Sequence, residues 1–268
     1  MVAGLEKLDA AGEDFGDEAV RLVDPTRPNV AAEFERFCPA VDPSLAPLAS
    51  VARALGPLVT DVVFIGGAVA PLLQTSPPFP RVRPTKDVDA IVAAAGYGDV
   101  EELHRRLEAQ GFRPAMSGRH LHQWLAPDGT AFDLVPAGTH AGGSGNPWAA
   151  AAIETATTHD IEPGLTIRHV SAPGFLALKW SAFRDRGQAD PLNSHDLEDI
   201  IALIASRPQL VPELRVAPHS LAGFIAEWSR WLLAHEYRDD LLAANLNNAT
   251  SVTATIAVVL ERLVLMAA

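Results

Sequence analysis

Apolar positions recur with two periods along this chain, and the change from one to the other divides it. Between residues 43 and 170, short apolar runs typical of strands alternate with stretches of helical spacing, whereas from Ser171 onward only helical spacing is found. Residues 1–42 hold acids, prolines and glycines with little periodicity, which is typical of a loosely held extension. We therefore expect an α/β (α+β) protein, with a short mixed sheet in residues 43–170 and a helical bundle in residues 171–268.

Strands are predicted where apolar residues form a short run or alternate with polar residues. The predicted strands span residues 61–65, 87–93, 121–127, 131–137 and 165–170. The turn "DGT" joins the third and fourth of them as a hairpin. In the second strand, period two places Asp87 and Asp89 on one face, while Val88, Ala90 and Val92 lie on the other.

Helices are predicted where apolar residues recur every three or four positions. The predicted helices span residues 43–55, 68–73, 99–110, 148–157, 172–186, 194–204, 219–235, 239–246 and 252–266. Ser171 is expected to cap the first helix of the bundle, and Asn193 or Ser194 the second. The glycine-rich residues 138–146 are expected to form a loop near the site.

Composition and charge narrow the classes of function. The chain has 268 residues, 48% of them hydrophobic, which is enough for a sizeable core. Its net charge of −12 argues against broad binding to nucleic-acid phosphates, since lysines and arginines supply that affinity. Cys38 is the single cysteine, which excludes an intramolecular disulfide and a cysteine zinc cluster. Without a long apolar run or a secretion-signal pattern, we expect a cytoplasmic protein with no membrane partner.

Gly66 and Gly67 stand directly between the first predicted strand and a short predicted helix. A turn without Cβ atoms lets a phosphate approach the backbone, and the N-terminus of the helix beyond it offers free N–H groups. The alternative is a tight turn whose only requirement is a positive φ. The Gly-Gly pair alone leaves both interpretations open.

Three carboxylates are candidates for a metal site. Asp87 and Asp89 share a strand face, and at about 4 Å two such charges repel by about 4 kcal/mol at an effective dielectric near 20. A divalent cation would relieve that repulsion. Asp133, on a separate strand, could complete a two-metal site for phosphoryl displacement, or it could be a strand-end acid that faces water. Acid-x-acid pairs also arise by chance in so acidic a chain.

The ordered combination of these motifs resembles the polymerase-beta-like nucleotidyltransferases. More narrowly, "IGGAVAPLL…RPTKDVD", "SAPGFLALKWSAFRDRG" and "SHDLEDIIALI" resemble the AbiEii-type family of bacterial abortive-infection and toxin–antitoxin nucleotidyltransferases, over about residues 45–204. Two departures stand out. Many members have serine where this chain has Gly67, and the spacer before Asp87 is longer than usual, so residues 74–84 must loop out.

The resemblance implies roles for the first group of site residues. Gly66 and Gly67 would hold the triphosphate of a nucleoside triphosphate. Asp87 and Asp89 would bind Mg²⁺, with Asp133 as the third ligand and possible base for the acceptor hydroxyl.

The resemblance also assigns roles in the helical part of the chain. Lys179 would contact the nucleotide phosphates, and Asp196 and Asp199 would orient Lys179 or the acceptor. A solvated helix lysine is the ordinary alternative, but the neighbours of Lys179 are mostly apolar. Arg184 and Arg186 fit either a solvated face or phosphate contacts, and that choice stays open.

Other polar and aromatic residues have simpler interpretations. Lys86 alternates to the face opposite the aspartates, so we interpret it as a surface charge or as a charge that supports the site indirectly. His120 and His122 share a strand face, but no third metal ligand is evident near them. Trp228 and Trp231 lie at helical spacing in a leucine-rich stretch, which favours packing.

The function that the resemblance implies is Mg²⁺-dependent transfer of a nucleoside monophosphate from a nucleoside triphosphate to a hydroxyl. The family favours RNA, such as a tRNA 3′ end, as the acceptor, and an antitoxin protein as a partner in a toxin–antitoxin or phage-defence system. Two alternatives stay open: transfer to a small molecule such as an antibiotic, and a non-catalytic nucleotide-binding or partner-binding module.

Overall fold

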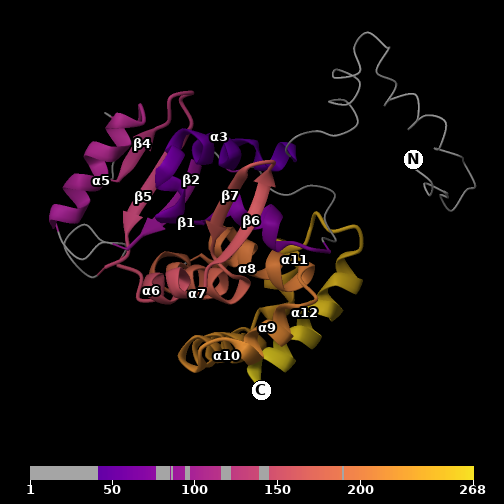
Figure 1. Ribbon diagram of the computed structural model, residues 1–268. Coiled ribbons are helices and arrows are strands. Elements are labelled where there is room, and N and C mark those ends of the chain that lie inside the picture. The colour runs from indigo at the N-terminus through magenta and orange to yellow at the C-terminus, as the bar shows by residue number, and fades with distance from the viewer. Residues whose placement is uncertain are drawn as a thin grey trace, which may run out of the picture. The chain divides into compact units, whose positions relative to one another are not determined.

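A mixed sheet organises the first part of the described chain, as the computed structural model shows (Figure 1). The structure describes residues 42–76, 85, 87–93, 97–115, 122–138, 145–188 and 190–268. Within these residues the sheet has seven strands in the order β3-β4-β5-β2-β1-β7-β6. The strands are β1 (Val62–Ile65), β2 (Asp87–Val92), β3 (Arg113–Pro114), β4 (Gln123–Leu125), β5 (Ala131–Pro136), β6 (Thr157–Glu162) and β7 (Leu165–His169).

The strand directions make the sheet mixed. β1 pairs in antiparallel fashion with β2 and in parallel fashion with β7, and β2 pairs in parallel fashion with β5. Antiparallel pairs β3–β4–β5 and β6–β7 complete the two edges. The β2–β5 pair aligns Asp89 with Asp133, and this register brings together residues that are distant in the sequence.

One face of the sheet is apolar and buried. Val88 and Ala90 of β2 and Phe132 and Leu134 of β5 are buried there, as the period of two predicts. Helix α5 (Tyr97–Ala109) covers this face through buried leucines, and Phe112 just after it packs against Phe132 with ring centroids 5.5 Å apart. Because these rings and aliphatic chains occupy one face of the sheet, the aspartates, which alternate with them along the strands, lie on the other face.

The remaining helices of the sheet portion are short. They are α3 (Ala46–Leu55), which follows a 3-10 turn at Pro43–Leu45, α4 (Ala70–Leu73), which follows a 3-10 turn at Gly67–Val69, and α6 (Ala149–Glu154). α3 buries Leu48, Val51 and Leu55 completely. The predicted helix over residues 148–157 was wrong at its end, because Thr157 begins β6.

From Ala172 onward the described chain is helical. The helices are α7 (Ala172–Ala182), α8 (His195–Ser206), α9 (Leu210–Val216), α10 (His219–Ala234), α11 (Arg238–Asn245) and α12 (Val252–Ala267), and a π-helical turn at Phe183–Gly187 continues α7. Both predicted caps are confirmed: the Ser171 hydroxyl accepts a hydrogen bond from Gly174 N at 3.2 Å, and the Ser194 hydroxyl accepts one from Leu197 N at 3.4 Å. α9 was not predicted.

An aromatic cluster joins α7 to α10. Trp180 stacks on Trp228 with centroids 5.1 Å apart, and Trp231 meets both rings edge-on. Trp180 is fully buried and Trp228 nearly so, whereas Trp231 is half-buried. The predicted packing is therefore confirmed in the core for Trp228 and at the margin of the core for Trp231. Sheet and helices together make Pro43–Ala268 one compact unit, and the expected boundary after residue 170 falls where β7 gives way to α7.

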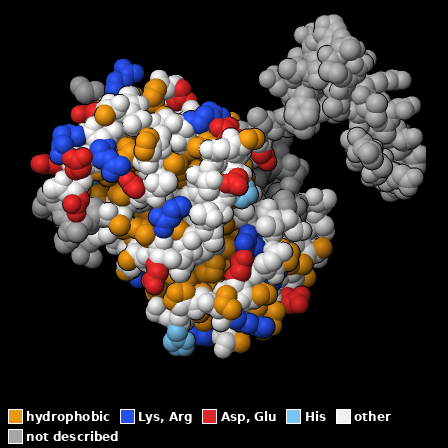
Figure 2. All heavy atoms as spheres, viewed as in Figure 1, with side chains coloured by type: hydrophobic (Ala, Val, Ile, Leu, Met, Phe, Trp, Pro, Cys, Tyr) orange, Lys and Arg blue, Asp and Glu red, His pale blue; other side chains and the backbone are white. Residues whose placement is uncertain are grey.

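Charge is unevenly spread over the viewed surface. In Figure 2, Lys, Arg, Asp and Glu side chains gather over α5, and hydrophobic side chains are frequent over the helical portion. Among the described residues, no helix is both long enough and apolar enough to cross a membrane.

Candidate functional site

Three aspartates converge on the face of the sheet opposite Val88 and Ala90. Asp89 of β2 lies directly beside Asp133 of β5, and Asp87 precedes Asp89 by two residues on the same face. One carboxylate oxygen from each of the three lies within 4.8 Å of the others. The prediction that Asp133 joins the Asp-x-Asp pair in space is therefore confirmed, and the arrangement could hold a metal ion.

The glycine turn packs directly against this cluster. Ile65, the last residue of β1, pairs with Asp89, so Gly66 follows beside the Asp89 carboxylate. A Cβ atom at Gly66 would lie 2.0 Å from Oδ2 of Asp89, and the backbone there has φ of 71°. Position 66 therefore requires glycine both for its conformation and for the close approach.

Gly67 differs from Gly66. A Cβ atom there would lie 3.4 Å from the side chain of Thr85, which is an ordinary contact distance. Gly67 opens the 3-10 turn that leads into α4, and α4 is only four residues long. A helix so short has a weak dipole end, so any phosphate held here would depend on backbone N–H groups and nearby cations.

The acidic cluster is electrostatically strained. Burial, followed by repulsion from Asp87 and Asp133, raises the pKa of Asp89 to about 7, while the positive charges of Lys179 and Arg186 act in the opposite direction. A buried carboxylate with like charges beside it is held at a cost that a bound divalent cation would lower.

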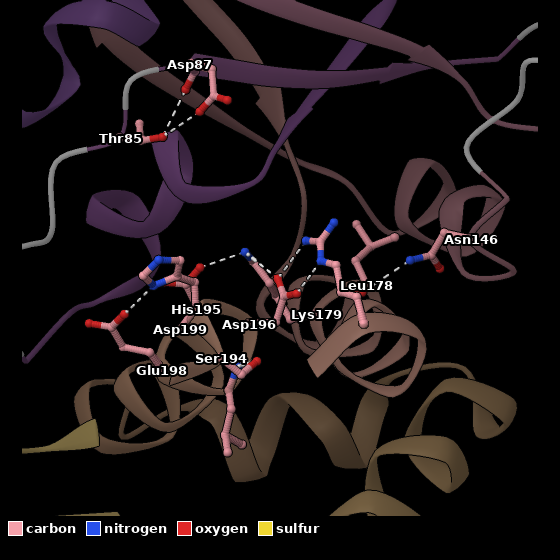
Figure 3. A network of polar contacts seen from close by, with 12 residues as sticks. Thr85, Asp87, Asn146, Leu178, Lys179, Ser194, His195, Asp196, Glu198 and Asp199 are labelled. Carbon is pink, nitrogen blue, oxygen red and sulfur yellow. Dashed lines mark hydrogen bonds and ion pairs between the residues drawn. The ribbon is translucent and has the colours of Figure 1, made fainter. Parts of the chain in front are cut away.

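Thr85, two residues before Asp87, supports the cluster (Figure 3). Its hydroxyl lies 3.0 Å from Oδ1 of Asp87 and 3.1 Å from the Asp87 carbonyl oxygen, and it can donate to either. Thr85 was not predicted as a site residue, although its spacing of two residues from Asp87 was a usable signal.

Lys179 of α7 lies between two carboxylates of α8. Its Nζ is 2.6 Å from Oδ2 of Asp199 and 3.2 Å from Oδ1 of Asp196, and the Lys179 side chain is only 16% exposed. Burial lowers the pKa of Lys179, but the two carboxylates outweigh that effect and raise it. Lys179 is therefore a charged lysine that is partly enclosed by protein, and the expectation that Asp196 and Asp199 orient it agrees with this geometry.

Arg186 shares Asp196 with Lys179. Its Nε and one terminal nitrogen donate to the two carboxylate oxygens of Asp196 at 2.8 and 3.1 Å. Burial opposes ionisation of Asp196, yet the hydrogen bonds from Arg186 and the charge of Lys179 prevail and lower its pKa. The helices thus present two cations anchored by a pair of aspartates, and sequence reasoning had left Arg186 undecided.

One further residue flanks the aspartates. Gln123 of β4 lies directly opposite Asp133 of β5, so its side chain projects from the same face as the acidic cluster. Its position could not be predicted without the register of the β4–β5 hairpin.

Several predicted features fall elsewhere. Lys86, His120 and most of the spacer and loop at residues 77–84 and 139–144 lie outside the described residues. His122 lies in the turn before β4, not within a strand as predicted. A pocket of 240 Å³ is lined in part by His169 and Arg207, and it contains none of the predicted site residues.

Comparison with known proteins adds a distant structural match. No protein-family model and no curated protein matches the chain. The crystal structure of JHP933 from Helicobacter pylori matches with a TM-score of 0.41 and 14% sequence identity, over 85% of this chain and 93% of that chain. At this TM-score nothing about function is carried over.

Proposed function

We propose that the protein is a Mg²⁺-dependent nucleotidyltransferase that moves a nucleoside monophosphate from a nucleoside triphosphate to a hydroxyl. The observation that carries the proposal is the convergence of three carboxylates from two strands within 4.8 Å. The raised pKa of Asp89 supports it, because a binding module has no need to cluster negative charge where phosphates would bind.

The residues present fit magnesium as the bound ion. Carboxylate oxygens are the ligands that hard divalent cations prefer, and Asp87, Asp89 and Asp133 would hold it. When bound, magnesium would neutralise charge on the reacting phosphate and favour ionisation of the acceptor hydroxyl. Lys179 would add positive charge from the helical side.

The proposed transfer forms one bond and breaks one bond at the same phosphorus atom. The acceptor oxygen forms a bond to the α-phosphorus, the bond from that phosphorus to the bridging oxygen breaks, and pyrophosphate leaves. The proton of the hydroxyl would pass to a carboxylate, for which the family resemblance points to Asp133. Catalysis would rest mainly on positioning and charge neutralisation.

The acceptor and the cellular role rest on the resemblance alone. The resemblance to the AbiEii-type family supports RNA as the acceptor and a toxin-like role restrained by an antitoxin. A small hydroxylated acceptor and a non-catalytic nucleotide-binding role are the alternatives that the same experiment separates.

The test is a labelling reaction. The full chain is incubated with Mg²⁺ and each labelled nucleoside triphosphate, in the presence of total RNA or of a small-molecule extract. We expect label in the RNA fraction. Label in small molecules would support the small-molecule alternative, and binding without transfer would support the module.

Two variants and a control decide the role of the cluster. Asp87→Ala and Asp89→Ala should each lower transfer by about 1000-fold, since both remove a ligand for the charge-neutralising ion. Asp239→Ala removes an exposed carboxylate of α11 whose ion pair in the described chain is with its neighbour Arg238, and it should leave transfer unchanged. Full activity in either cluster variant would sink the proposal.

A further inference from the structure

A hydrogen bond and a closely packed glycine hold the π-helical turn after α7. Gln188 N donates to the carbonyl of Phe183, five residues earlier, at 3.1 Å. A Cβ atom at Gly187 would lie 2.4 Å from a ring carbon of Phe183 and 2.5 Å from the Ser194 hydroxyl oxygen. Only glycine therefore lets the turn close against the cap of α8. Turns of this kind are rare and frequently lie at functional sites.

The turn gives its two arginines different surroundings. Arg184 reaches back to Asp185 and Ser181, with Nε 3.0 Å from an Asp185 oxygen. Arg186 reaches forward to α8 and binds Asp196 through a two-pronged contact at 2.8 and 3.1 Å. Arg184 is thus held within its own turn, whereas Arg186 is anchored to a carboxylate of another helix.

The anchoring leaves part of Arg186 available. A guanidinium carries five N–H groups, and the contact with Asp196 uses two of them. No other hydrogen bond or ion pair of Arg186 is found among the described residues, and its side chain is 73% exposed. Three N–H groups, all on the two terminal nitrogens, are therefore not used by this contact, and the contact fixes their orientation.

Arg186 lies beside Lys179 through the carboxylate that they share, and its charge acts on the acidic site. Asp89 and Arg186 each act on the other's charge, and Lys179 acts on Asp89 in the same sense as Arg186. Asp196 binds both cations, at 3.2 Å for Lys179 and 2.8 Å for Arg186. Because Lys179 is largely enclosed, Arg186 is the cation of this pair that a bound molecule can reach more widely.

We propose that Arg186 is a phosphate-binding residue of the nucleotide site, held in place by Asp196 so that its unused N–H groups bind the polyphosphate of a magnesium-bound nucleoside triphosphate. The inference rests on the proposed function for the identity of the ligand. A planar fork matches two phosphate oxygens at once. Because Asp196 already fixes the side chain, little rotamer entropy remains to be lost on binding.

The experiment compares the two arginines in the full chain. The Kd for each nucleoside triphosphate and for inorganic tripolyphosphate is measured with Mg²⁺, together with KM and kcat for transfer. Arg186→Gln should weaken both ligands by about 10-fold to 100-fold, as expected for charged hydrogen bonds, and raise the nucleotide KM more than it lowers kcat. Arg186→Lys, which keeps the charge but not the fork, should lie in between, and Arg184→Gln should change each value less than about twofold.

The outcomes separate this inference from the proposed function. If the wild type transfers nucleotides and Arg186→Gln has the wild-type KM, Arg186 has no such role and the nucleotidyltransferase stands. If tripolyphosphate binds through Arg186 but no nucleotide is transferred, the phosphate site stands and the proposed function falls. Equal loss in Arg184→Gln and Arg186→Gln, or no binding of either ligand by the wild type, overturns the inference.

Discussion

The candidate site has a strand-borne half, in which charges of one sign lie together, and a helix-borne half, in which opposite charges pair. On the strands, Asp87, Asp89 and Asp133 are packed together, and burial followed by repulsion from Asp87 and Asp133 raises the pKa of Asp89 to about 7. On the helices, Lys179 is held by Asp196 and Asp199 at salt-bridge distances. The helix-borne half thus contains its own counterion, whereas the strand-borne half gathers charges of one sign.

This difference indicates that a bound ligand completes the strand-borne half of the site. Charges that are neutralised within the fold stabilise it and keep side chains in place, and their loss should weaken the protein. Charges that repel within the fold destabilise it until a ligand arrives. Neutralising substitutions in the two halves should therefore have opposite effects on stability.

The largest effect is expected from Lys179→Met. This variant leaves two largely buried carboxylates without their shared cation and should lower the free energy of unfolding by about 3–5 kcal/mol. Chemical denaturation measures it. The double variant Lys179→Met with Asp199→Asn should recover part of the loss, because one uncompensated charge is gone. If the single variant were as stable as the wild type, Lys179 would not be neutralising these carboxylates within the fold.

Gly66→Ala tests how closely the strand-borne half is packed. The added Cβ would meet the Asp89 carboxylate at 2.0 Å in a backbone of positive φ, so we expect a loss of about 2–4 kcal/mol. Gly129→Ala is the matched control, since Gly129 has φ of 91° but nothing within 4 Å of an added Cβ. If both variants lost the same free energy of unfolding, backbone strain alone would explain the loss in Gly66→Ala, without the contact with Asp89.

Asp89→Asn should stabilise the metal-free protein. The pKa of Asp89 lies at about 7 in the folded chain against 3.8 for an ordinary aspartate, so the folded state binds more protons between these two values. The free energy of unfolding of the wild type therefore falls as pH rises through this range and levels off above it. The variant should gain about 1–3 kcal/mol over the wild type at pH 8, and almost none below the ordinary pKa.

The smallest effect is the response to the metal. Mg²⁺ at about ten times its Kd should stabilise the wild type by about 1.4 kcal/mol, seen as a rise in Tm. Asp89→Asn should lose most of that rise, whereas Asp239→Asn should keep it. A rise in Tm that is the same in all three proteins would place the ion elsewhere.

Local patterns predicted the strand-borne half well. The alternation in residues 87–92 predicted that Asp87 and Asp89 share a face, and the Gly-Gly pair after an apolar run predicted the turn at Gly66. Both follow from the geometry of neighbouring residues. That Asp133 lies beside Asp89 depends on strand register, so before the structure it was only a possibility.

Pairing across the chain explains most of what was missed. β6 was not predicted because its first four residues, Thr157–Asp160, are exposed and polar, so an edge strand held by pairing with β7 leaves no apolar alternation. α9 contains a proline and is short, which hid its helical spacing. The role of Asp196 as a shared anchor for Lys179 and Arg186 required the packing of α7 on α8.

The position of β7 in the sheet has a consequence during synthesis of the chain. β1 carries the glycine turn, but its parallel neighbour β7 and the backbone bond from Val170 N to Phe64 O come from a much later part of the sequence. Lys179, Asp196 and Asp199 are made later still. A chain emerging from the ribosome can therefore gather the three strand aspartates before the cations that face them exist, and it gains a complete site only when α8 has been released.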